Sequence, residues 1–317
     1  MSPTRDADLL VVGAGPAGVA AAVMASSLGM TCVVVEAEQV GSKLQAIGAL
    51  ENVPGGWSTG SELAEALAGD LARHQELGRV SVLSGRAVRV AGHDDHAEVA
   101  LEDGRVLTAS AVVVATGVTA LEPGDVFWID APESKPLSPL WRAAPEDLKG
   151  RRVVVLGADR PLGTWLRAHP QAAVHLDVLF PESDRYKTDE VADDPRIRLD
   201  LVDCVTVAPV PKGFRITASR PGGGAHVFVV DTVLSNIGSK PAVVPGLVAG
   251  ADGYCPPDKQ HPRILVAGDL KGPRMQRIAV AMGDGARAAL EPYYREQAVP
   301  GGPSTTARRL RGNQPAG

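Results

Sequence analysis

The sequence predicts an α/β protein that contains two Rossmann-like βαβ units. Strand and helix patterns alternate at both ends of the 317-residue chain, which is typical of parallel, doubly wound sheets. Two apolar strand segments, near 8–12 and 152–156, each run into a glycine-containing turn that is followed by a helical segment. A strand, a tight turn and a helix in this order form the start of a dinucleotide-binding unit.

The first unit carries a complete dinucleotide motif. Its turn contains Gly13, Gly15 and Gly18, an Ala-rich helix follows, and a second strand ends at Glu36. Gly13 permits the tight turn, Gly15 lets the backbone approach a pyrophosphate, and Gly18 allows close packing of the helix on the sheet. A carboxylate at the position of Glu36 can accept hydrogen bonds from ribose hydroxyls. These residues in register predict nucleotide binding.

Two further strand ends favour FAD over NAD as this nucleotide. A strand over 111–115 ends at Thr116-Gly117, and a strand near 263–267 ends at Gly268-Asp269, ahead of a helix rich in small residues. An acid in that place can bind the ribityl hydroxyls, while the positive end of the helix faces the flavin ring.

The segments 86–109 and 197–236 show alternating apolar residues, and the first contains an Asp103-Gly104 turn. We expect each segment to form a small antiparallel sheet that braces its domain.

Several segments resemble the FAD-binding elements of the low-molecular-weight thioredoxin reductase family. They are the motif at 13–18, the Ala-Thr-Gly at 115–117 and the segment 267–289. The loop 41–56 resembles the flavin-contacting loop of that family, and 234–247 resembles its return crossover.

The resemblance covers nearly the whole chain, to about residue 292. It implies an FAD-binding domain formed by 1–118 and 242–296, a degenerate NAD(P)-like domain inserted at 119–241, and a homodimer. The Pro-, Gly-, Ser- and Arg-rich segment 297–317 is expected to be a disordered tail. The expected cofactor-binding residues are Gly13, Gly15, Pro16, Ala17, Gly18, Glu36, Leu44, Asn52, Thr116, Gly117, Gly268, Asp269, Arg277 and Ile278.

The family's redox-active CxxC is missing. Its place falls at 140–143, which reads Leu-Trp-Arg-Ala, and the three cysteines Cys32, Cys204 and Cys255 are far apart, without metal-type spacing. Disulfide exchange needs an attacking thiolate and a partner thiol, so thioredoxin reduction by the family mechanism is excluded. From the local patterns we expect Cys32 and Cys204 to be buried and Cys255 to be exposed.

The second nucleotide motif is damaged. Gly157 matches its first glycine, but Asp159 replaces the second and Leu162 the third. A carboxylate near two phosphates costs about 1 kcal/mol even in water, and we expect Leu162 to crowd the contact between helix and strand. The family's arginine-rich 2′-phosphate segment is reduced to Arg185 and Lys187 among acidic residues. The sequence therefore predicts that NADPH and NADH do not bind here in the usual way.

Three residues are candidates for a place near the flavin. If the resemblance holds, Lys43 and Arg277 each replace a neutral glutamine beside the ring. Cations there would stabilise the anionic reduced flavin and raise its potential; the alternative is that both point to solvent. Trp141, in the vacated CxxC place, lies over the flavin, lines a substrate pocket or packs in the core.

Composition restricts the partners and the location. A net charge of −5 and a pI near 5.8 give no electrostatic basis for nucleic-acid or anionic-membrane binding. The sequence contains no run of about 18 apolar residues and no N-terminal apolar leader, so we expect a cytoplasmic protein.

The leading hypothesis is an FAD-dependent oxidoreductase without a redox disulfide. Its substrate would be a small molecule or a carrier-bound group, and its electrons would come from that substrate, a ferredoxin or a separate reductase. Two alternatives stay open: a non-catalytic FAD-binding regulatory dimer, and an NAD(P)H-dependent flavin reductase with a non-thiol acceptor.

Overall fold

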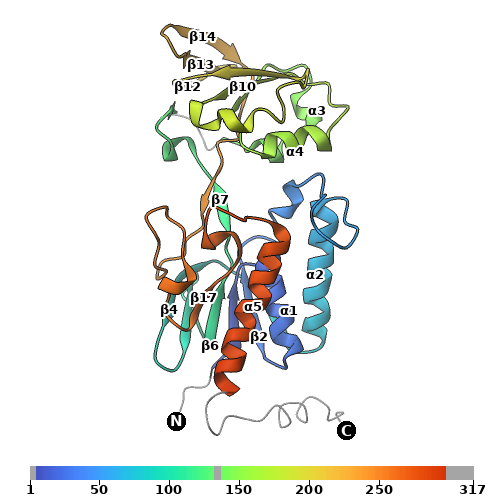
Figure 1. Ribbon diagram of the computed structural model, residues 1–317, viewed down its shortest axis with the longest axis vertical. Helices are drawn as coiled ribbons and strands as arrows, with labels where there is room; N and C mark the ends of the chain where they lie inside the picture. Colours follow the sequence, from blue (N-terminus) through green and yellow to red (C-terminus); the bar gives the residue numbers. More distant parts are fainter. Residues whose placement is uncertain (1–4, 132–136, 298–317) are drawn as a thin grey trace. The chain divides into compact units, whose positions relative to one another are not determined.

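The computed structural model describes residues 5–131 and 137–297, which form two units (Figure 1). Unit 1 comprises Met1–Gln45, Glu51–Val118 and Pro241–Gly317, and unit 2 comprises Ala46–Leu50 and Thr119–Lys240. Strands β7 (Val118–Ala120) and β16 (Ser239–Pro241) pair with each other, and each spans one of the four points where the chain passes from one unit to the other. The predicted disordered tail lies outside the described residues, except for Gln297 at the end of helix α5.

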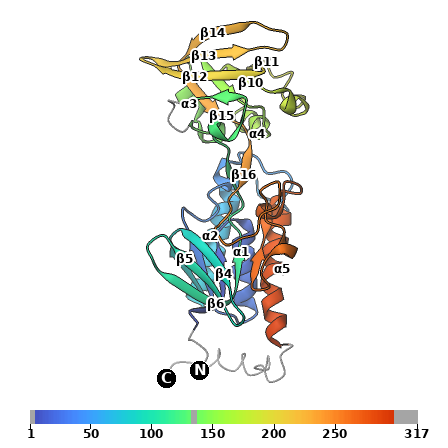
Figure 2. The same cartoon turned by 90° about the vertical axis from the view of Figure 1, so that its left-hand side faces the viewer.

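Unit 1 is built on one seven-stranded mixed sheet. Its order is β3-β2-β1-β6-β5-β4, and β17 pairs with the second half of β6. The strands β3, β2, β1, β6 and β17 are parallel, whereas β4, β5 and β6 form antiparallel pairs (Figure 2). The strands are β1 (Ala7–Val12), β2 (Cys32–Glu36), β3 (Val80–Ser84), β4 (Ala87–Gly92), β5 (Ala97–Leu101), β6 (Val106–Val114) and β17 (Ile264–Val266).

The expectation of a separate antiparallel sheet over 86–109 is therefore wrong, although its hairpin turn at Asp103-Gly104 is present. The segment joins the main sheet because β6 is long enough to pair with β5 through its first half and with β17 through its second half.

The core of unit 1 follows from its continuous apolar strands. Leu9, Leu10 and Val11 of β1 are fully buried, as expected of a parallel strand that is covered on both faces. The helices of the unit are α1 (Pro16–Ser27), α2 (Gly60–Glu76) and α5 (Ile278–Gln297). Helices α1 and α5 lie side by side (Figure 1), and a Cβ atom added at Gly285 would lie 1.8 Å from the carbonyl oxygen of Ala17. Glycine at 285 is therefore what allows these helices to approach.

Unit 2 contains two four-stranded sheets. The parallel sheet has the order β11-β10-β9-β15, and the second sheet has the order β14-β13-β12-β8. Helix α4 (Pro161–Ala168) follows β9, and a short helix α3 spans Pro145–Leu148. The strands are β8 (Ile129–Asp130), β9 (Val153–Leu156), β10 (Leu176–Phe180), β11 (Ile197–Leu201), β12 (Cys204–Val210), β13 (Gly213–Ser219), β14 (Ala225–Val230) and β15 (Thr232–Ser235).

The prediction of one antiparallel sheet over 197–236 is correct only in its middle. Strands β12, β13 and β14 lie side by side and antiparallel (Figure 2), but β11 and β15 belong to the parallel sheet. Alternating apolar residues show that a strand is half-buried, but they do not show which strand it pairs with.

Two of the three cysteine expectations are wrong. Cys255 is fully buried, and Cys204, at the start of β12, is exposed. Cys32 is buried as expected, and burial together with the charge of Asp8 raises the pKa of its thiol to about 12. Among the described helices, none combines the length and apolar character needed to cross a membrane.

Candidate functional site

The first nucleotide turn in unit 1 is tightly constrained by backbone contacts. The amide of Gly13 donates to the carbonyl oxygen of Val35 (2.8 Å), and Gly13 has a φ of +97°. A Cβ atom at Gly13 would lie 2.7 Å from the carbonyl oxygen of Ala115, and one at Gly18 would lie 1.8 Å from that of Gly13. Both glycines are therefore required by the packing of the turn itself.

Gly15 differs from these two glycines. Its φ of −74° suits any residue, and no heavy atom of the described residues lies within 4 Å of the Cβ position. Gly15 is the N-cap residue of α1, where no described side chain accepts from the helix amides and the first turn carries no acidic residue. Its backbone therefore borders open space at the positive end of a helix, which is the arrangement that binds a pyrophosphate.

Glu36 lies beside the same turn. One oxygen of its carboxylate accepts from the amide of Ala14 (2.5 Å), and the other accepts from the amide of Glu38 (2.8 Å). These bonds orient the carboxylate, and each oxygen keeps a further lone pair for a ribose hydroxyl.

The other predicted cofactor residues also belong to unit 1. The hydroxyl of Thr116 donates to the carbonyl oxygen of Ala242 (2.6 Å), and Gly117 has a φ of +66°. Leu44 is fully buried, whereas Asn52 is exposed. Pro16 and Ala17 form the first turn of α1, and Ile278 begins α5.

The carboxyl of Asp269 interacts electrostatically with both predicted cations, Lys43 and Arg277. It follows β17, within the short helix Gly268–Lys271, and is half-buried. Burial raises the pKa of its carboxyl, the positive charges of Lys43 and Arg277 oppose this rise, and Asp284 adds to it. Charges from residues far apart in sequence thus act on the carboxyl of Asp269, which lies just after β17 with the other predicted flavin residue, Gly268.

Lys43 is in an unusual environment for a lysine. It borders solvent over much of its surface, yet the surrounding protein is dense enough that burial lowers its pKa, and Asp269 opposes this effect. Arg277 is exposed, and its guanidinium donates to the carbonyl oxygen of Gln276 (2.8 Å). A place for Lys43 and Arg277 beside the flavin ring stays a prediction.

Gln276, which was not among the predicted site residues, holds the loop between Asp269 and α5. Its amide donates to the carbonyl oxygens of Gly272 (3.1 Å) and Asp269 (3.3 Å) and to the hydroxyl of Tyr254 (3.3 Å). The loop contains Met275, the one described non-glycine residue with a positive φ (+62°). A glutamine in a polar loop gives no sequence signal for such a role.

The second motif, in unit 2, repeats the first turn. The amide of Gly157 donates to the carbonyl oxygen of Leu179 (2.8 Å), Gly157 has a φ of +91°, and a Cβ atom there would lie 2.5 Å from the carbonyl oxygen of Asn236. The side-chain amide of Asn236 donates to the carbonyl oxygen of Asp159 (2.8 Å). The strand and turn of a nucleotide-binding unit are therefore intact.

Beyond that turn, Asp159 of the second motif takes part in ion pairs. The ammonium of Lys187 lies 3.2 Å from a carboxylate oxygen of Asp159 and 2.9 Å from one of Asp184. All three side chains are at most one-quarter exposed. Arg185, the other cation left from the predicted 2′-phosphate segment, pairs with Glu182 (2.8 Å). Both cations therefore already have acidic partners within unit 2.

Leu162 does not behave as predicted. Helix α4 begins four residues after Gly157, whereas α1 begins three residues after Gly13, and each helix has proline at its first position. This one-residue difference places Leu162 in the hydrophobic core with Val155 and Leu166, and it is fully buried there. Leu162 thus stabilises the packing of the helix instead of crowding it.

The vacated CxxC place forms a short 3₁₀ helix, Leu140–Arg142. Trp141 is half-buried, and the guanidinium of Arg142 lies 4.6 Å from the centre of its ring, in a cation–π contact. The role of Trp141 over the flavin, in a substrate pocket or in the core stays a prediction.

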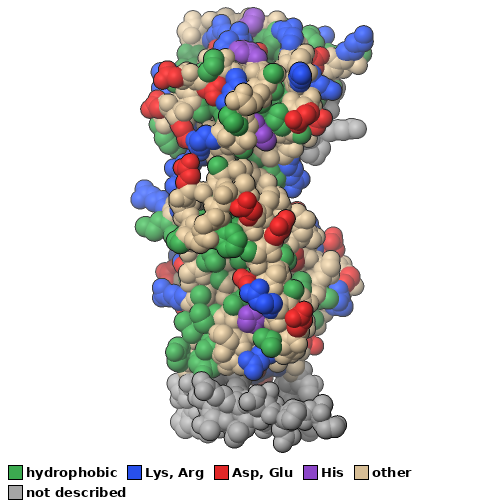
Figure 3. Space-filling model, turned by 90° about the vertical axis from the view of Figure 1, so that its right-hand side faces the viewer, with side chains coloured by type: hydrophobic (Ala, Val, Ile, Leu, Met, Phe, Trp, Pro, Cys, Tyr) green, Lys and Arg blue, Asp and Glu red, His purple; other side chains and the backbone are tan. Residues whose placement is uncertain are grey.

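Figure 3 shows acidic and basic side chains intermixed on the face it draws of each unit. Charges so distributed do not add to a long-range field of one sign over that face.

Comparison with known proteins is consistent with this geometry. Residues 7–124 match the sequence family described as pyridine nucleotide-disulphide oxidoreductase. The chain is 26% identical over 305 residues to an alkyl hydroperoxide reductase subunit of Staphylococcus aureus (strain Mu50 / ATCC 700699), covering 90% of this chain and 58% of that protein. It is 28% identical over 307 residues to the corresponding protein of Xanthomonas campestris pv. phaseoli, covering 90% of this chain and 56% of that protein. The chain thus spans little more than half the length of these relatives.

Two solved structures have a similar fold. Lactococcus lactis thioredoxin reductase in its FR conformation superimposes with a TM-score of 0.77 at 17% identity, covering 91% of this chain and 98% of that one. The enzyme from T. acidophilum gives 0.75 at 22% identity, covering 93% and 100%. The fold is thus the thioredoxin reductase-like α/β fold, as predicted. The family match is confined to residues 7–124, and the similarity to these two structures concerns the fold alone.

Proposed function

We propose that the chain binds FAD in unit 1 and is an FAD-dependent oxidoreductase that works without a redox disulfide and without NAD(P)H as its direct electron donor. The observation that carries the proposal is the contrast between the two motifs: open space beside Gly15, and the Asp159–Lys187–Asp184 ion pairs at the second motif.

The residues of unit 1 fit FAD. The amides at the start of α1, which no described side chain caps, and the open space at Gly15 suit the pyrophosphate, and Glu36 suits the adenosine ribose. Asp269 suits the ribityl hydroxyls, and Lys43 and Arg277, whose charges act on Asp269, would supply positive charge beside the flavin ring. When bound, FAD would supply the redox chemistry, and these side chains would hold it and favour its reduced form.

The residues of unit 2 do not fit a dinucleotide. An incoming pyrophosphate would meet the Asp159 carboxylate and would have to separate it from Lys187. Neither 140–143 nor any other part of the sequence carries a CxxC pair. We therefore propose a substrate other than thioredoxin, either a small molecule or a carrier-bound group, and electrons from that substrate, a ferredoxin or a separate reductase.

Gly15→Ala tests the FAD site. The backbone at Gly15 accepts a side chain and the space is open, so the variant should fold normally while its methyl group excludes the pyrophosphate. We expect at least a tenfold loss of FAD affinity, measured by flavin content after purification and by titration of the FAD-free protein.

Gly124→Ala is the matched control, because it also adds a methyl group where no described heavy atom lies within 4 Å, but in unit 2. It should retain FAD. Equal flavin content in both variants, or a wild-type protein without flavin, would refute the proposed site.

A further inference from the structure

The hairpin between β4 and β5 gathers two histidines and a glutamate on one face. The amide of His93 donates to the carbonyl oxygen of His96 (2.8 Å), so these residues face each other across a two-residue turn, Asp94-Asp95. Glu98 lies two residues after His96, on the same side of β5, because side chains alternate along a strand. Its cross-strand partner is Ala91, which is small and leaves room above the pair.

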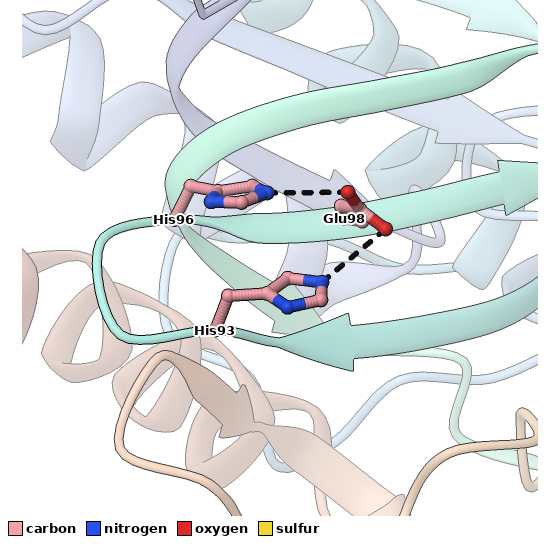
Figure 4. Close-up of side chains that lie close together, drawn as sticks. All are labelled: His93, His96 and Glu98. Atoms are coloured by element: carbon pink, nitrogen blue, oxygen red, sulfur yellow. Dashed lines mark hydrogen bonds and ion pairs between the residues drawn. The ribbon is translucent and has the colours of Figure 1, made fainter. Parts of the chain in front are cut away.

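The three side chains point at one another (Figure 4). Nε2 of His93 lies 3.3 Å from one oxygen of Glu98, and Nε2 of His96 lies 3.1 Å from the other. The two imidazole rings are stacked, with centres 4.5 Å apart and planes inclined by 15°. One potential ligand atom from each residue lies within 4.8 Å of the others.

These distances suit a metal ion. Bonds of about 2.0–2.2 Å from a tetrahedral Zn²⁺ to nitrogen and oxygen place its ligands roughly 3.3–3.5 Å apart. Small side-chain rotations would bring the three donors to that separation. Two imidazoles with one carboxylate favour borderline transition-metal ions over Mg²⁺ or Ca²⁺, which prefer oxygen ligands.

A second carboxylate orients one of the imidazoles. Nδ1 of His96 lies 2.6 Å from an oxygen of Asp95, while its Nε2 faces Glu98. A carboxylate on the far nitrogen is the usual outer partner of a metal-binding histidine, since it fixes the tautomer with a lone pair on the other nitrogen. The turn is also held from behind, because Arg5 and Arg263 donate to the carbonyl oxygens of Asp95 (2.6 Å) and Asp94 (2.8 Å).

We propose that His93, His96 and Glu98 bind one divalent transition-metal ion of the Zn²⁺ class at the tip of the β4–β5 hairpin, with Asp95 as a positioning residue. The exposed side of the cluster leaves the remaining coordination positions to water. The site is separate from the proposed FAD site and does not depend on the proposed function.

The test is Zn²⁺ titration of the full chain, purified without a histidine tag and stripped of metal, in competition with a chromophoric chelator. We expect one ion per chain, and at least a tenfold loss of affinity in His93→Ala, in His96→Ala and in Glu98→Gln. Asp95→Asn should weaken binding by about 10-fold or more through the orientation of His96. Asp94→Asn, in the same turn, and His226→Ala, on the exposed face of β14, should bind Zn²⁺ as the wild type does.

A second readout reports the ligands directly. Co²⁺ in the site should show a ligand-field spectrum that His96→Ala abolishes and Asp95→Asn alters, while far-ultraviolet circular dichroism of each variant stays unchanged. Failure of the wild-type chain to bind Zn²⁺, or equal binding by the His93→Ala/His96→Ala double variant, would overturn the proposal and leave a hydrogen-bonded cluster only.

Discussion

The ammonium of Lys187 lies 3.2 Å from the carboxylate of Asp159. Asp159 has the position in the second motif that Gly15 has in the first. In unit 1 the corresponding space is open, whereas in unit 2 the chain fills its own motif with a charged pair. One carboxylate oxygen of Asp184 lies 2.9 Å from the same ammonium, and the other accepts a hydrogen bond from the amide of Ala158 (3.4 Å). These contacts join the second motif to the segment that carries Asp184 and Lys187 within unit 2.

Removal of Lys187 should therefore destabilise unit 2. Lys187→Ala leaves Asp159 and Asp184 close together without a counter-charge, and we expect the free energy of unfolding to fall by about 1–3 kcal/mol. Lys212→Ala, at an exposed position, should change it by less than about 0.5 kcal/mol. Chemical denaturation of both variants measures the difference, and equal stabilities would show that the ion pairs contribute nothing.

The same pairs predict a pH dependence. Burial lowers the pKa of Lys187, but Asp159 and Asp184 outweigh it and raise the pKa above its ordinary value of 10.5. The stabilisation is therefore fully present below 10.5 and is lost as the pH rises through the raised value. Wild-type protein should lose more stability in that range than Lys187→Ala does. Parallel pH profiles for the two proteins would contradict this expectation.

We expect alanine substitutions at Gly285 and Gly283, both in α5, to change the free energy of unfolding in opposite directions. A methyl group at Gly285 would lie 1.8 Å from the carbonyl oxygen of Ala17, so Gly285→Ala should force α1 and α5 apart and cost about 1–3 kcal/mol. Gly283 is exposed, with no described atom within 4 Å of the Cβ position, so Gly283→Ala should stabilise the helix by up to about 1 kcal/mol. Thermal unfolding compares the two, and a stable Gly285→Ala protein would refute the close helix contact.

If FAD binds at the proposed site, the charges of Lys43 and Arg277 should raise the midpoint potential of the flavin. Lys43→Gln and Arg277→Gln each remove positive charge near Asp269, so reduction of the flavin should become less favourable. We expect the midpoint potential to fall by about 10–40 mV, since 30 mV corresponds to about 1.4 kcal/mol for a two-electron couple. Lys259→Gln, on an exposed 3₁₀ helix, is the control. An unchanged or higher potential in both test variants would show that these cations do not act on the flavin.

The fold and the first motif could be predicted because their signals are local. Gly13 and Gly18 are required by backbone contacts a few residues away or across one strand, and a continuous apolar run such as β1 reports burial on both faces. Strand partners could not be predicted, because the alternation in β11 and β15 says nothing about which neighbour each strand pairs with.

The predictions that were wrong concern residues whose places depend on tertiary contacts. A one-residue change in the start of α4 moves Leu162 into the core, and Cys255 is buried although its Pro-Pro context suggests a loop surface. The convergence of Lys43 and Arg277 on Asp269 joins three segments far apart in sequence. The His93–His96–Glu98 cluster is local, and its sequence signal is two histidines flanking a two-residue hairpin turn.

By the proposed function, this chain holds FAD but does not accept electrons from a nicotinamide nucleotide. Anaerobic stopped-flow mixing of the flavin-loaded protein with excess NADPH, and separately with NADH, tests it most directly. Ion pairing of Lys187 with Asp159 predicts an oxidised flavin spectrum that stays unchanged with either nucleotide, while dithionite still reduces it. Bleaching of the flavin by NADPH or NADH within seconds would show that a nicotinamide nucleotide is a direct electron donor and would overturn the proposed function.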